Sequence, residues 1–270
     1  MKKIILVSLV GIAFIAGLFC ETKNFSVGNT KLSVVSIPAK KGVKSFYMAT
    51  TEITQALYST VMGENPSYKQ GDTLPVNKVS WFDALVFCNK LSLLLGKTPV
   101  YLVDGEINTS KWEYESGKIW GKITFNETAN GFRLPTKEEW ENSLGYDEEY
   151  IYEYGTYWEA NKKIVYDKVT EYPNFKKGEL VIENNKVIRG KDAFNDIAVK
   201  AKDVPQPVAT KIPNKYGLYD MLGNIGEWVW VYKNNTSQFR YVENKGREYN
   251  SREYVGDAKI DTIGFRVCCN

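Results

Sequence analysis

Five short phrases, in a fixed order along the chain, constrain most strongly what this sequence can fold into. They read TEITQ at 51–55 continuing to GENP at 63–66, PVNKVSW at 75–81, GFRLPT at 131–136 with EEW at 138–140, YGLYDMLGN at 216–224 with Glu227 and Trp228, and GFRV at 264–267. One such phrase is weak evidence, but five in order form a specific signal. With 270 residues, 43% hydrophobic and 14% aromatic, the chain can bury a substantial core as a single domain.

These phrases resemble the formylglycine-generating-enzyme family, whose domain is the sulfatase-modifying-factor domain. The resemblance covers roughly residues 42 to 267 and implies an α+β, C-type-lectin-like fold, a single domain with much irregular structure. The oxidases of that family carry two cysteines on the segment before the closing Gly-Phe-Arg. This chain has no cysteine between Val229 and Phe265. The resemblance therefore implies the family's fold without its known chemistry.

The N-terminus has the pattern of an export signal. Lys2 and Lys3 precede an uncharged apolar run at residues 4–19, which is shorter than the roughly 20 residues that a membrane span needs. We expect residues 1–20 to be a signal peptide, residues 21–41 a tether and first strand, and residues 42–270 the sulfatase-modifying-factor-like domain. The protein is then exported to a bacterial cell envelope.

Cys20 directly follows the apolar run, which suggests a bacterial lipoprotein that is cleaved before this cysteine and acylated on it. Phe19 is larger than the residue that normally precedes such a cysteine. The match to a lipoprotein signal is therefore incomplete and leaves two alternatives: a protein anchored by lipid at Cys20, or a periplasmic or secreted protein. The membrane is expected as a partner only through that anchor.

Composition excludes several classes of function. The chain has no histidine, which removes the usual general base and every Ser-His or Cys-His nucleophile pair. Without the signal it carries 33 basic and 32 acidic residues, well mixed, so we expect no nucleic-acid partner. Most enzyme classes are therefore disfavoured.

Local patterns predict three capped helices and several strands. Thr54, Ser80 and Thr136 each precede an apolar periodic segment as N-caps, and Gly63 and Gly96 end the first two helices. Glu138 and Glu139 are interpreted as acids that favour a helix start rather than as a catalytic pair. Strands are expected at 100–103, 118–120, 122–125 and 131–134. Cys88 falls on the apolar stripe of the second helix, which predicts a buried thiol.

Asn224 and Glu227 are the candidate metal ligands. The resemblance associates these two positions, with nearby backbone carbonyls, with a bound calcium, and calcium prefers such oxygen ligands. Asp220 is a neighbour, and Gly226 stands where the family usually has tryptophan. The alternative is a structural turn in which both side chains bind backbone N–H groups.

The C-terminal cysteines do not match the family's catalytic positions. Cys268 and Cys269 follow the last Gly-Phe-Arg, and adjacent cysteines bond each other only with strain. A bond from one of them to Cys88 or to a partner chain is the more natural expectation for an oxidising compartment. Copper is therefore not expected as a cofactor.

The segment before the closing phrase has the composition of a binding surface. Tyrosine and arginine alternate with asparagine and serine, as in antibody paratopes, and arginine adds planar recognition of carboxylates or phosphates. In lectin-like folds this region commonly forms the ligand face. The alternative is a solvated loop surface with Arg266 in a buried ion pair. The candidate ligand-binding residues are Tyr232, Arg240, Tyr241, Arg247, Tyr249, Asn250, Arg252 and Tyr254.

Three functions follow from these patterns. The first is a non-catalytic, exported or surface-anchored protein that binds a protein or glycan ligand through this C-terminal face. The second is a formylglycine-generating-type oxidase that acts on a cysteine of a sulfatase-like protein. The third is a structural envelope protein. We favour the first, because the oxidase cysteines and all histidines are absent.

Overall fold

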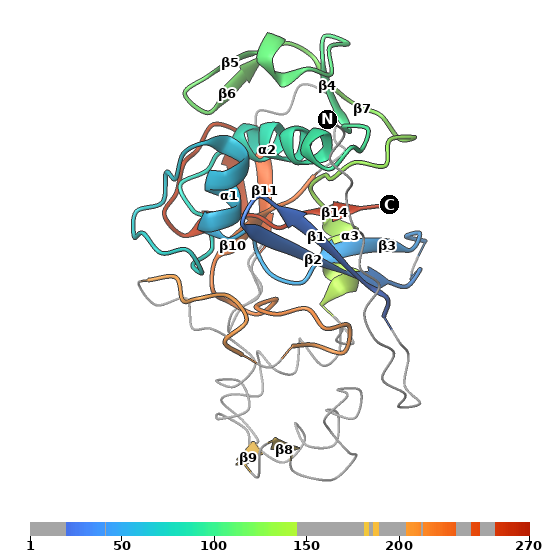
Figure 1. The fold of residues 1–270 in the computed structure, drawn as a ribbon, viewed down its shortest axis with the longest axis vertical. Helices are drawn as coiled ribbons and strands as arrows, with labels where there is room; N and C mark the ends of the chain where they lie inside the picture. The colour runs from blue at the N-terminus through green and yellow to red at the C-terminus, as the bar shows by residue number, and fades with distance from the viewer. Residues whose placement is uncertain are drawn as a thin grey trace.

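The computed structural model describes residues 20–40, 42–144, 181–183, 186–188, 204–211, 213–230, 239–243 and 252–270. Within these residues it is a mixed α/β fold with three short α-helices and several small sheets joined by long irregular connections (Figure 1). This confirms the predicted α+β fold class. Two four-stranded sheets and two packed helices position the residues of interest.

The first sheet joins the two ends of the described chain. Its order is β1-β2-β3-β14, with every neighbouring pair antiparallel. The strands are β1 (Thr22–Val27), β2 (Thr30–Ile37), β3 (Phe46–Ala49) and β14 (Cys268–Cys269). The prediction for residues 21–41 was a tether and a first strand, and the structure has two strands there. Both β1 and β2 form there, because β2 buries Leu32, Val34 and Ile37 against the domain.

The second sheet carries the region predicted to bind a ligand. Its order is β12-β11-β10-β13, antiparallel except for the parallel pair of β10 and β13. The strands are β10 (Gly226–Trp228), β11 (Phe239–Glu243), β12 (Arg252–Val255) and β13 (Ile263–Gly264). Gly264 is required in β13, since a Cβ there would lie 2.2 Å from the Val76 carbonyl oxygen.

Three two-stranded sheets and a 3₁₀ turn complete the strands. The pairs are β4 (Tyr101–Val103) with β7 (Ile123–Phe125), β5 (Glu113–Glu115) with β6 (Lys118–Trp120), and β8 (Val181–Glu183) with β9 (Lys186–Ile188); η1 is Thr109–Lys111. Three of these strands occur where the sequence predicted them. The predicted strand at 131–134 is wrong, because only Arg133 pairs there, with Cys268. The flanking N–H groups of Phe132 and Leu134 donate instead to side chains.

The helices follow their predicted caps. They are α1 (Gln55–Met62), α2 (Trp81–Leu94) and α3 (Lys137–Ser143). The N-cap hydroxyls of Thr54, Ser80 and Thr136 accept the expected backbone bonds, and the last two form complete capping boxes. Gly63 ends α1 in the left-handed region, with φ 85°.

The core lies between α1, α2 and the two sheets, and aromatic rings fill much of it. Trp81 stacks on Trp230 with ring centroids 5.2 Å apart, and Tyr58 stacks on Phe87 at 5.5 Å. Cys88 is fully buried here, as predicted. In the part of the chain that the structure describes, no helix is both long and apolar enough to cross a bilayer.

Candidate functional site

The last Gly-Phe-Arg phrase places Arg266 in a fully buried ion pair with Glu227 of β10. Arg266 Nη2 lies 2.6 Å from Glu227 Oε1, and its Nε lies 2.7 Å from Oε2. Trp140 Nε1 donates to the same Oε2 at 2.7 Å. The remaining guanidinium donors reach the carbonyl oxygens of Ala49 and Tyr219. The structure thus agrees with the interpretation of Arg266 as a structural ion pair.

Two further buried carboxyl groups lie beside this pair. Glu52 is 1% exposed and Asp220 is 2% exposed, yet both carboxylate oxygens of Glu52 and Oδ1 of Asp220 have no hydrogen-bond donor. The other oxygen of Asp220 accepts from the backbone N–H of Ala209 at 2.7 Å. Three buried carboxyl groups therefore lie near a single buried arginine.

Burial, and next to it the Asp220 charge, raises the pKa of Glu52 well above the ordinary value of a glutamate. Burial also raises the pKa of Asp220, and the two carboxyl groups lie close enough to influence each other. Two carboxyl groups in contact can hydrogen-bond only when one of them is protonated. A proton held between the two groups would give one Glu52 oxygen and Oδ1 of Asp220 a partner, and the other Glu52 oxygen would still have no donor.

Both candidate metal ligands have protein partners. Asn224 exchanges hydrogen bonds with the Gln206 backbone, at 3.0 Å to Oδ1 and 3.4 Å from Nδ2. Glu227 uses both oxygens for Arg266 and Trp140. Among the described residues no group of three or more His, Cys, Asp or Glu side chains is arranged to hold a metal ion. Asn224 agrees with the structural-turn alternative, whereas Glu227 accepts from side chains rather than from backbone N–H groups, and calcium stays a prediction.

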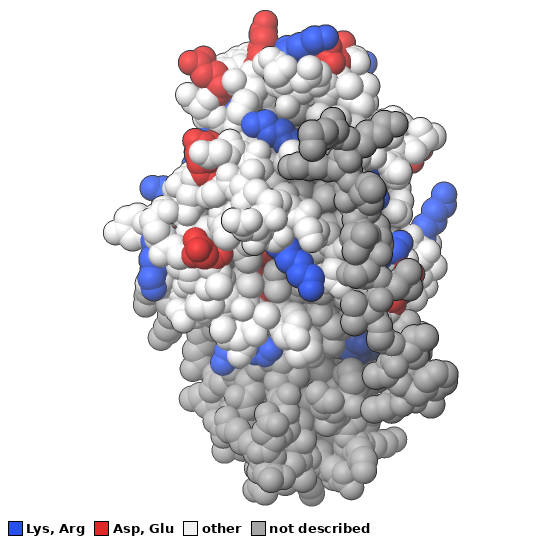
Figure 2. All heavy atoms as spheres, in the orientation of Figure 1, with Lys and Arg blue, Asp and Glu red and all other residues white. Residues whose placement is uncertain are grey.

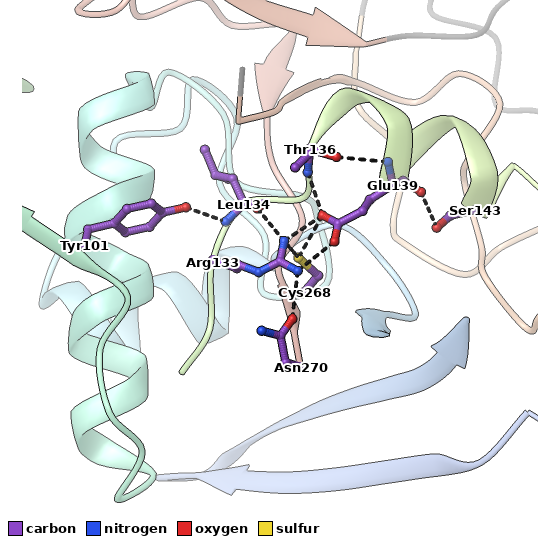
Figure 3. A network of polar contacts seen from close by, with 8 residues as sticks. All are labelled: Tyr101, Arg133, Leu134, Thr136, Glu139, Ser143, Cys268 and Asn270. Atoms are coloured by element: carbon purple, nitrogen blue, oxygen red, sulfur yellow. Dashed lines mark hydrogen bonds and ion pairs between the residues drawn. The ribbon is translucent and has the colours of Figure 1, made fainter. Parts of the chain in front are cut away.

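A second buried network forms around Arg133 (Figure 3). Its guanidinium meets Glu139 of α3 in two bonds, Nη1 to Oε2 at 2.6 Å and Nη2 to Oε1 at 2.7 Å. Nη1 also lies 2.9 Å from Cys268 Sγ, and Nη2 donates to the Asn270 side chain at 2.9 Å. Glu139 is therefore more than a helix-start acid, since it joins the start of α3 to the C-terminal strand.

The cysteines are held as separate, buried thiols. Cys268 and Cys269 are consecutive residues of β14, so their side chains leave opposite faces of the strand. Cys268 contacts Arg133, and Cys269 belongs to the hydrophobic core. Burial raises the pKa of both thiols and that of Cys88. All three are free, so the expected bond between Cys88 and a C-terminal cysteine is absent.

The predicted ligand-binding residues are only partly described. Arg240 and Tyr241 lie on β11 and Arg252 on β12; Arg240 pairs with Tyr254, and Val242 with Arg252. Tyr254 is half-buried and packs edge-on against Trp228, with ring centroids 6.2 Å apart, so it supports the core. Tyr232, Arg247, Tyr249 and Asn250 lie outside the described residues.

A family model for the sulfatase-modifying factor enzyme 1-like domain matches residues 17–270. The chain belongs to this family. It is 30% identical over 284 residues to the chaperone protein LppX of Paenibacillus barcinonensis, covering 94% of this chain and 92% of that protein. This establishes the predicted family resemblance.

Two solved structures share the fold of this sulfatase-modifying-factor family member. The Treponema denticola variable protein 1 superposes with a TM-score of 0.68 at 22% identity, covering 92% of this chain and 98% of that one. CarF superposes with a TM-score of 0.53 at 23% identity, covering 93% and 96%. At these identities the likeness concerns the fold alone.

Sequence reasoning missed Glu52 as a site residue and gave Asp220 only a secondary place. Both residues lie within the five phrases on which the family resemblance rests, and this was the one sequence signal that could have marked them as site residues. Neither residue has a local pattern that reveals burial, because Glu52 precedes a helix cap and Asp220 lies in a turn. Only the fold brings them to Arg266.

Proposed function

We propose that this family member is a non-catalytic binding protein of the bacterial cell envelope, exported and held there by an acyl anchor at Cys20 or released in soluble form. Its partner is a protein, which docks on the surface around the β11–β12 hairpin. Glycan binding, oxidase activity and a purely structural envelope role are the alternatives that the experiments below separate.

The placement of Cys268 and Cys269 carries the non-catalytic part of this proposal. A copper(I) oxidase site needs two thiolates that converge on one metal. Here the two side chains diverge from one strand, and burial keeps both thiols protonated. The chain has two other cysteines: Cys88, which is buried, and Cys20, which precedes β1.

The choice of a protein partner has two supports. The curated relative LppX, at 30% identity over nearly the whole chain, is named a chaperone protein, and a chaperone binds polypeptides. The hairpin carries Arg240, Tyr241 and Arg252 at its strand positions, and tyrosine with arginine is typical of protein-binding surfaces.

Copper(I) titration of the purified protein, with mass spectrometry of a cysteine peptide substrate, tests the non-catalytic part. We expect no stoichiometric tight copper binding and no loss of the peptide thiol. A Cys268→Ser/Cys269→Ser variant is the control for adventitious sulfur binding. Copper-dependent turnover that disappears in this variant would establish the oxidase alternative instead.

Suppression of the aggregation of a heat-unfolded enzyme, citrate synthase, tests polypeptide binding. We expect the wild type to suppress aggregation, and a variant with Tyr241, Arg247 and Tyr249 changed to Ala to lose most of this effect with an unchanged Tm. The matched control changes Tyr68, Lys69 and Trp120, which are exposed elsewhere, to Ala. Equal activity of the two variants would exclude the hairpin face, and saturable binding only to a glycan array would point to the glycan alternative.

A further inference from the structure

Cys20 lies two residues before the first strand of the first sheet. The strand β1 begins at Thr22, and the Glu21 carbonyl already accepts a bond from the Ser36 N–H at 2.8 Å. Two residues of extended chain span at most about 7 Å. A lipid attached to Cys20 therefore leaves no tether between the membrane and the folded domain.

The short connection fixes which part of the domain meets the bilayer. The polar headgroup layer is roughly 5–7 Å thick on each side of the hydrocarbon core. An acyl chain that enters the core from Cys20 thus brings the adjacent end of the sheet to the level of the headgroups. Whatever side chains lie at this end contact lipid.

The turn between β2 and β3, residues 38–45, lies at the same end of the sheet. Thr22 pairs with Val35, and Ile37 pairs with Phe46, so the turn begins next to Cys20. Reciprocal backbone bonds of 3.1 and 2.9 Å between Lys40 and Val43 close it. The Asn142 side chain donates to the Lys40 carbonyl at 3.0 Å and holds the turn against α3.

This end of the sheet is basic. Lys23 and Lys44 are exposed and Lys40 is half-exposed, with the Lys23 ammonium 3.6 Å from the Tyr47 ring centroid. Residues 21–23 and 38–45, which form this end, contain four lysines and one acid, Glu21, whereas residues 46–270 contain more acids than bases. The Tyr47 hydroxyl donates to Glu21 and partly satisfies that single carboxylate.

We propose that the Cys20 end of the first sheet is a membrane-contacting surface on which Lys23, Lys40 and Lys44 bind anionic phospholipid headgroups. This inference rests on the proposed envelope location and adds a fixed orientation to it. Basic side chains are dispersed over the face drawn in Figure 2 rather than gathered in one large patch. Three lysines bind a bilayer weakly alone, but beside the acyl chains on Cys20 they add attraction to anionic headgroups and fix the orientation of the domain.

The lysine surface can be tested without acylation. A Cys20→Ser form of the mature chain is sedimented with vesicles of phosphatidylcholine, with and without phosphatidylglycerol. We expect binding only to the anionic vesicles, and a fall of about 100-fold in the partition coefficient when Lys23, Lys40 and Lys44 become Gln, since each lysine contributes about fivefold. The control with Lys31, Lys69 and Lys122 changed to Gln has the same charge and lies elsewhere. Equal loss in both variants, or no preference for anionic vesicles, would overturn the proposal.

The orientation is tested on the exported wild-type chain in phosphatidylglycerol-containing vesicles by lysine acetylation and mass spectrometry. We expect acetylation of Lys23, Lys40 and Lys44 to slow several-fold relative to detergent solution, with Lys31, Lys69 and Lys122 unchanged. Uniform protection of all six lysines would contradict the assigned surface. The intact mass of the same sample reports the acyl groups on Cys20, so a failure of the lipid anchor is seen separately from a failure of the lysine surface.

Discussion

The chain contains Gly-Phe-Arg twice, at 131–133 and 264–266, and the two arginines form two buried ion pairs that differ in their surroundings. Each guanidinium makes two bonds of 2.6–2.7 Å to one glutamate, Arg133 to Glu139 and Arg266 to Glu227. Around Arg133 the neighbours are a neutral thiol and an amide. Around Arg266 they are two more carboxyl groups.

This difference concerns charge balance rather than geometry. One cation and one anion balance at Arg133, so its network is complete except for the Nε group. At Arg266 one cation faces three potential anions, and three carboxylate oxygens have no donor. A buried excess of negative charge is relieved most simply by proton uptake. The two pairs should therefore respond differently to mutation and to pH.

The largest expected effect is that of Arg266→Met. It leaves Glu227 buried without its cation beside Glu52 and Asp220, so we expect a loss of about 4–5 kcal/mol of unfolding free energy. Urea denaturation followed by far-UV circular dichroism measures it. The double variant Arg266→Met/Glu227→Gln should recover part of the lost stability. If Arg266→Met cost no more stability than Arg133→Met, the extra carboxyl groups around Arg266 would not contribute to the loss.

Arg133→Met should cost somewhat less, about 3 kcal/mol, by the same physical reasoning. Glu139 keeps the bond from the Thr136 N–H at 2.8 Å, and no second Asp or Glu side chain lies among the residues shown around it (Figure 3). The measurement is the same urea titration, with Arg133→Met/Glu139→Gln as the matched control. If the control were no more stable than the single variant, the carboxylate would not be the source of the loss.

Glu52→Gln should stabilise the protein above neutral pH. The folded pKa of Glu52 is raised, so its contribution is fully present below the ordinary carboxyl pKa of about 4 and is lost as pH rises through the folded value. We expect Tm of the variant to exceed that of wild type by about 2–4 °C at alkaline pH, for roughly 1 kcal/mol. Calorimetry across pH measures it.

The exposed Glu127→Gln is the control for that experiment and should leave the pH profile of Tm unchanged. A wild-type Tm that rises with pH in parallel with that of Glu52→Gln would mean that Glu52 and Asp220 share no proton. Asp220→Asn should reduce the pH dependence in the same direction, although its lost bond to the Ala209 N–H also costs stability.

Cys268→Ser is expected to have the smallest effect, within about 1 kcal/mol, because the hydroxyl still accepts from Arg133 Nη1. Cys268→Val, which removes the acceptor, should lower the stability more. Thermal unfolding of both variants measures this. A large loss for the serine variant would indicate that the thiol contributes mainly by packing.

The local part of the fold was predictable from the sequence. The caps at Thr54, Ser80 and Thr136 depend on residues within three positions, and they were confirmed. The family and the fold class followed from the ordered phrases. The burial of Cys88 followed from the helical period.

The remaining parts depend on distant residues. The strand predicted at 131–134 failed because Ser92 and Tyr101 side chains take its N–H groups, which no local pattern reveals. Only one strand was predicted in residues 21–41, because the pairing of β1 with β2 has no local sequence signal. Glu227 and Arg266 are 39 residues apart in the sequence, and Glu52 joins them from the other end of the chain. The calcium and ligand-face predictions remain predictions.

The position of β14 has a consequence for the order in which the protein can fold. The first sheet includes residues 22–49 and also residues 268–269, and Asn270 binds Arg133. A chain that emerges from a ribosome with its N-terminus first cannot complete this sheet until residues 268–269 arrive. The pairing of β3 with β14 and the bond from Arg133 to Asn270 are therefore among the last contacts of this sheet that can form during synthesis.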